Sequence, residues 1–109
     1  MYVNFEGNEI FMIKHIVMWK MADIDDKHQR AIDIKTQLEM LKDKIDVIVD
    51  IQVGINFNTS DAASDVVLVS TFKSKEDLAV YQEHPAHKAV GSDYVRPYVK
   101  ERRVADYEF

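Results

Sequence analysis

The chain has 109 residues, of which 47% are hydrophobic and 30% charged, and its formal net charge is −5. This length allows one domain with one hydrophobic core, and the composition excludes a disordered chain. The acidic balance argues against nucleic-acid binding and against an anionic membrane surface as partner. The sequence contains no cysteine, which excludes disulfides, thiolate metal sites and cysteine nucleophiles.

The first eleven residues, Met1–Phe11, show no periodicity, and we interpret them as an N-terminal extension before a domain that spans 12–109. They lack the basic region of a signal peptide, and Met12 is an alternative start. No segment is long and apolar enough to predict a membrane span. We therefore expect a cytoplasmic protein.

The first predicted strand is Phe11–Lys20, which is rich in β-branched and aromatic residues. Both of its faces are largely apolar, so both should be covered. One face carries Ile13, His15, Val17 and Trp19, and the other carries Met12, Lys14, Ile16 and Met18.

The next segment predicts an amphipathic helix, because apolar residues recur at steps of three and four. They are Ala31, Ile34, Leu38, Leu41 and Ile45. The stripe lasts about two heptads, which favours a core-facing helix over a coiled coil.

Two strands are predicted next, Val47–Asn56 with strict alternation and Asp65–Phe72 as a nearly continuous apolar run. Their short polar connection indicates an antiparallel hairpin. A second helix should begin after Ser74 and end near Glu83.

Pro85 ends the second helix and suits the first position of another. This third helix should loosen near Gly91, and a further turn should be broken again at Pro97. A last strand is predicted over Glu101–Phe109.

This order predicts an α+β, ferredoxin-like β-α-β-β-α-β fold with a four-stranded antiparallel sheet and helices on one side. The other side of the sheet has nothing within the chain to cover it. Because strands Phe11–Lys20 and Asp65–Phe72 are apolar on both faces, we predict a homodimer formed by sheet-to-sheet packing.

The segment "YQEHPAHKAV" carries the candidate site. Pro85 places His87 in the first turn of a helix, where the helix dipole favours a neutral ring at pH 7. Tyr81 lies in the last turn of the preceding helix. If the helices cover the strand face that carries His15, these three side chains meet in one pocket. Its predicted walls include Trp19, Val66 and Leu68.

Such a pocket suits acid/base chemistry without cofactor or metal, with His87 abstracting a proton next to a carbonyl and Tyr81 stabilising the enolate. Local order also fits purely structural roles, in which His84 flanks a helix and Tyr81 belongs to the core. A metal site on "HPAH" is a further interpretation, although Pro85 keeps His84 outside the helix.

These residues resemble the stress-responsive A/B barrel (Dabb) family. The resemblance rests on "MIKHIVMWK", "VGIN", "DVVLVSTF", "YQEHPAHKAV" and "RRVADYEF", and covers about Met12–Phe109. It implies a dimeric α+β barrel and, in several plant members, an association with stress. Some plant relatives are polyketide cyclases that use a tyrosine and a histidine at the positions of Tyr81 and His87. His15 also has a counterpart, whereas a further cyclase histidine corresponds to Val66.

Two functional hypotheses follow. In the first, the protein is a homodimer that binds a small apolar ligand or serves as a scaffold. In the second, it is a cofactor-free enzyme acting on a carbonyl compound by aldol, lyase or monooxygenase chemistry, with His87 as base and Tyr81 as donor. An open pocket around these residues favours ligand binding or catalysis, and a filled core favours the scaffold.

Overall fold

The fold is a four-stranded antiparallel sheet built around β3 (Ile13–Met21). This strand pairs with β5 (Val66–Phe72) on one side and β6 (Val99–Glu108) on the other, and β4 (Asp50–Ile55) extends the sheet beyond β5. The computed structural model describes residues 2–3, 6–7 and 9–109. The strand order β4-β5-β3-β6 is that of the predicted ferredoxin-like fold, which is confirmed.

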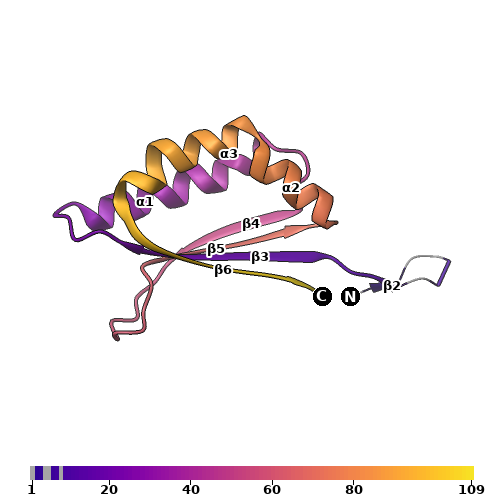
Figure 1. Ribbon diagram of the computed structural model, residues 1–109, viewed down its shortest axis with the longest axis horizontal. Helices are drawn as coiled ribbons and strands as arrows, with labels where there is room; N and C mark the ends of the chain where they lie inside the picture. Colours follow the sequence, from indigo (N-terminus) through magenta and orange to yellow (C-terminus); the bar gives the residue numbers. More distant parts are fainter. Residues whose placement is uncertain (1, 4–5, 8) are drawn as a thin grey trace.

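The helices all lie on one face of the sheet, and the opposite face carries no helix (Figure 1). The helical segments are α1 (Lys27–Glu39), η1 (Met40–Asp43), α2 (Lys75–Glu83), α3 (Pro85–Val90), the π-helical turn η2 (Gly91–Val95) and the 3₁₀ turn η3 (Arg96–Tyr98). In the described part of the chain, no helix combines the length and apolarity that crossing a bilayer requires.

The break between α2 and α3 follows from local chemistry. The hydroxyl of Ser74 accepts a hydrogen bond from the Asp77 amide and begins α2. The extended backbone of His84 ends it, as expected for a residue before proline. His84 Nδ1 then accepts a hydrogen bond from the Ala86 amide, so this imidazole caps α3, which begins at Pro85. The predicted boundary is confirmed.

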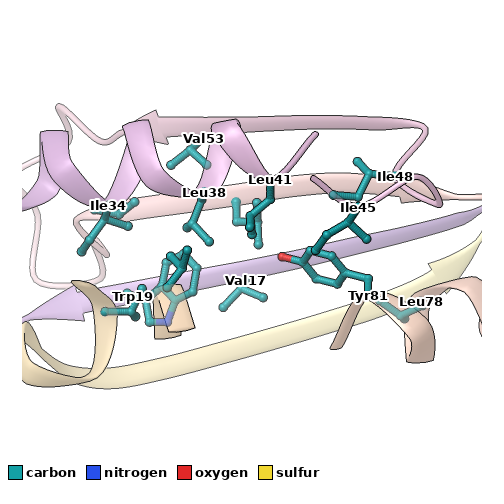
Figure 2. Close-up of a cluster of buried hydrophobic side chains, with 14 of the residues drawn as sticks. Val17, Trp19, Ile34, Leu38, Leu41, Ile45, Ile48, Val53, Leu78 and Tyr81 are labelled. Carbon is teal, nitrogen blue, oxygen red and sulfur yellow. The ribbon is translucent and has the colours of Figure 1, made fainter. Parts of the chain in front are cut away.

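The core lies between α1 and the helix-facing side of the sheet (Figure 2). All five apolar residues of the predicted helical stripe are at most 3% exposed. The strand predicted over Val47–Asn56 begins only at Asp50, because Ile45–Val49 forms the turn that leaves η1. Ile48 is nevertheless buried there.

The uncovered side of the sheet, called the outer face below, is apolar at its centre. The register places Ile16 opposite Val69 on one side and Ala105 on the other, and Met18 opposite Val67. None of these five side chains is buried, and Met18 is 41% exposed. An apolar strip across three strands therefore lies open in the single chain.

Strands β1 (Tyr2–Val3) and β2 (Glu9–Ile10) pair with each other in a separate two-stranded sheet. The predicted extension Met1–Phe11 includes residues 1, 4, 5 and 8, which lie outside the described residues. Directly after this segment, Met12 and Phe109 exchange two backbone hydrogen bonds of 3.0 Å, which join the beginning and the end of the predicted domain. The boundary between extension and domain stays a prediction.

Candidate functional site

A cavity of about 340 Å³ opens between the sheet and the helices. This volume lies at the lower end of the range of small-molecule sites. The wall is mostly apolar, with a few polar groups that converge on it. The lining consists of His15, Val17, Trp19, Leu38, Leu68, Tyr81, His87, Gly91, Val95, Arg96, Val99 and Arg102.

His15 projects from β3 toward the helices and is 2% exposed. The register pairs it with Asp106 of β6, and its Nδ1 forms a hydrogen bond to the Asp106 carboxylate. Because a carboxylate only accepts, this bond places a proton on Nδ1. Asp106 therefore orients the His15 ring at the sheet side of the cavity.

Tyr81 is fully buried, and its ring contacts three other rings. Its ring lies 5.0 Å from Phe72, 6.2 Å from His15 and 4.5 Å from His87, measured between ring centroids. Figure 2 shows its hydroxyl pointing away from Leu78 into the space between α1 and the sheet. No described residue makes a hydrogen bond to this hydroxyl. Burial raises the pKa of Tyr81, although Arg102 opposes this shift, so the phenol stays protonated.

His87 faces Tyr81 from α3. Its Nδ1 lies 3.1 Å from the carbonyl oxygen of Gln82. A carbonyl only accepts, so Nδ1 carries the proton and Nε2 of the neutral ring keeps a free lone pair. Burial is the main cause that lowers the pKa of His87; the Gln82 bond opposes it, while His15, Arg102 and Arg96 add to it. Glu83 lies in an ion pair with Lys88, 3.0 Å away.

We predict that the His87 ring titrates below 6.5, the ordinary histidine value, and is neutral at pH 7. The unfolded chain then binds the proton more readily, so stability should fall as pH drops below about 6.5 toward the folded-state pKa. NMR titration measures the pKa of the ring directly. The His87 signal is assigned by its disappearance in the His87→Gln variant. A titration midpoint above 7 would contradict the neutral ring, and the variant should show a flatter dependence of melting temperature on pH.

Two arginines complete the cavity wall. Arg96 belongs to η3 and Arg102 to β6, so they approach from the helix layer and from the sheet. Arg96 Nη2 donates a 2.8 Å hydrogen bond to the hydroxyl of Ser92. In the register of the sheet, Arg102 stands opposite Trp19. Both side chains are exposed, which places them where the cavity meets solvent.

The structure brings five of the six predicted site residues to this cavity: His15, Trp19, Leu68, Tyr81 and His87. The structure places the sixth, Val66, in the core, where it is fully buried and is not among the residues that line this cavity. Trp19 of β3 pairs with Val66 of β5 on one side and with Arg102 of β6 on the other. Of these three residues, Trp19 and Arg102 line the cavity. The roles assigned to the five remaining residues stay predictions.

Sequence reasoning did not find Asp106, Arg96 and Arg102. The alternation of the last strand does place Arg102, Val104 and Asp106 on one face. This face is mostly charged, however, and nothing local shows that it joins the apolar face of β3. Among the described residues, no three potential ligands cluster closely enough to hold a metal ion. His84, from the metal interpretation, caps α3 instead.

Comparison with known structures shows the same fold in several proteins. A dimeric protein of unknown function with a ferredoxin-like fold from Bacteroides fragilis is 35% identical, with a TM-score of 0.82 over 90% of this chain and 96% of that chain. A dimeric ferredoxin-like protein of unknown function from Thermobifida fusca is 20% identical, with a TM-score of 0.76 over 100% of both chains. The hydroxynitrile lyase of Passiflora edulis is 14% identical, with a TM-score of 0.72 over 93% and 95%.

Comparison with curated proteins gave no match. The family profile described as the stress-responsive A/B barrel domain matches residues 13–109, which is nearly the whole chain. The chain belongs to the stress-responsive A/B barrel (Dabb) domain family.

Proposed function

We propose that the protein is a homodimer in which each protomer binds a small, largely apolar molecule in the cavity beneath α1 and α3. The observation that carries this proposal is the Tyr81 hydroxyl, which is buried beside the cavity without a partner among the described residues. An unsatisfied buried hydroxyl costs about 1–3 kcal/mol. A ligand that accepts its hydrogen bond removes this cost, whereas a scaffold needs neither the hydroxyl nor the cavity.

The polar groups define what the ligand carries. Tyr81 offers a donor, which suits a carbonyl oxygen, and Nε2 of His87 offers an acceptor. The centroids of the two rings lie 4.5 Å apart, so a ligand that carries an acceptor and a donor close together would suit both. Val17, Trp19 and Leu68 surround the rest of the ligand with apolar surface.

The dimer is supported by the open apolar strip on the outer face. Packing two copies sheet to sheet would cover it and leave the cavity, which lies on the other side of the sheet, intact in each protomer. The relatives from Bacteroides fragilis and Thermobifida fusca are dimeric. The proposed location of the protein remains the cytoplasm, and a stress-related role rests on the family alone.

The first test uses Tyr81→Phe. We expect this variant to gain about 1 kcal/mol, because the unpaired hydroxyl is removed, and to melt a few degrees higher. It should bind the neutral ketone acetophenone more weakly, by about three- to tenfold, because one hydrogen bond is lost. The indole N–H signal of Trp19, the single tryptophan, reports binding by NMR.

Gly91→Leu is the matched blocking variant, since this helical position faces the cavity and only Arg96, at 3.9 Å, lies near an added Cβ. It should keep the fold and lose acetophenone binding. A destabilised Tyr81→Phe, or a Trp19 signal unchanged by millimolar acetophenone, would show that Tyr81 is a core residue and would favour the scaffold.

The second candidate is a cofactor-free enzyme, favoured by the Gln82 bond that leaves Nε2 of His87 as the basic atom. In this reaction Nε2 takes a proton from the carbon next to a carbonyl, and the Tyr81 hydroxyl stabilises the enolate oxygen. Aldol addition or cleavage of a carbon–carbon bond follows the same pattern, and the Passiflora relative is a lyase. Exchange of the acetophenone methyl protons in D₂O measures this step, which His87→Gln should abolish.

A further inference from the structure

We propose that the ligand of the cavity carries an oxyanion, a carboxylate or a phosphate, which Arg96 and Arg102 bind at the mouth. This inference rests on the proposed function and names the class of molecule that the site takes. The ligand is then an amphiphilic anion, with its apolar body inside, its carbonyl at Tyr81 and its charge at the opening.

The first support is the absence of a carboxylate partner for either arginine. Among the described residues, no ion pair involves Arg96 or Arg102, and the only side-chain partner of Arg96 is the neutral Ser92. The ion pairs of this structure engage other basic residues, namely Lys27, Arg30, Lys35, Lys75, Lys88 and Lys100, besides His15. In a chain with nineteen acidic residues, two guanidinium groups that have no carboxylate partner among the described residues therefore flank one cavity.

The second support is the reach of these charges into the cavity. Besides its burial, His87 has its pKa lowered by both arginines, and Arg102 also acts on buried Tyr81. The positive potential therefore extends from the mouth to the polar groups inside. Asp106, which also belongs to β6, is already paired with His15.

The third support is the chemistry of the two groups. A guanidinium presents a planar set of donors that matches an oxyanion in a bidentate manner. Arg96 and Arg102 come from different layers of the fold, so an anion between them is held from two sides. Both are hydrated before binding, and the positive mouth attracts anions to an otherwise acidic protein.

The test compares 3-benzoylpropanoate with its neutral primary amide, followed at the Trp19 indole signal. We expect the carboxylate to bind at least about tenfold more tightly than the amide at low salt. Arg102→Gln and Arg96→Gln should each reduce this preference to about threefold or less, mainly by weakening the carboxylate. Lys88→Gln is the control, because it removes the same charge from α3 at a residue that does not line the cavity.

The outcomes separate this proposal from the proposed function. If carboxylate and amide bind equally and Tyr81→Phe weakens both, cavity binding stands and the anionic class is wrong. If Lys88→Gln lowers the preference for the carboxylate as much as Arg102→Gln does, the preference reflects the overall charge of the protein. The proposed arginine site is then wrong. If neither compound changes the Trp19 signal, both proposals are wrong. Phenyl phosphate, tested in the same way, distinguishes phosphate from carboxylate as the bound group.

Discussion

Val69→Asp is expected to convert the dimer into folded monomers of 12.7 kDa. Val69 lies on the outer face, between Ile16 of β3 and Gln52 of β4. Its side chain is half-buried in the single chain, so a carboxylate there can reach water in the monomer. In the proposed sheet-to-sheet dimer the same carboxylate would be enclosed without a partner, which costs several kcal/mol. Light scattering at micromolar concentration measures the mass directly.

Val80→Asp is the matched control, because it makes the same change at a valine on α2 that is 51% exposed. This variant should remain dimeric. A wild-type chain that runs as a monomer, or a Val69→Asp variant that stays dimeric, would exclude the outer face as the interface.

Leu68→Asp should prevent folding, although it lies one residue from Val69. Leu68 faces the helices and is 2% exposed, and the register places it between Val17 and Val53. A carboxylate enclosed by these side chains costs several kcal/mol, which is comparable with the whole stability of a small domain, about 5–15 kcal/mol. We expect no cooperative thermal transition and no near-ultraviolet circular dichroism.

Leu68→Met keeps the volume and the apolar character of the side chain, so it should melt within a few degrees of the wild type. A Leu68→Asp variant that melts as high as Leu68→Met would mean that water reaches this wall of the cavity. The two aspartate variants together test the strand geometry, because adjacent residues of one strand point to opposite faces of the sheet. Val69→Asp should therefore split the dimer, whereas Leu68→Asp should prevent folding.

The sequence by itself determined the order of the four main strands and of the helices, because these depend on local chemistry. The stripe from Ala31 to Ile45 has the period of a helix, and the alternation in Ile13–Trp19 has the period of a strand. Pro85 also determines locally that α2 ends at Glu83 and that His87 lies in the first turn of α3. These features need no knowledge of distant residues, so they could be predicted.

The tertiary structure decided which residues of the last strand lie at the cavity. Pairing of β3 with β6 places Asp106 beside His15 and Arg102 beside Trp19, and these pairs are separated by more than eighty residues in the chain. Nothing in the local pattern of the last strand specifies that register, because its charged face is equally suited to solvent. The structure also shows that Val66 is not among the residues that line the cavity and that the Tyr81 hydroxyl has no partner among the described residues. Periodicity is a property of a segment, whereas register and burial arise only when segments pack against one another.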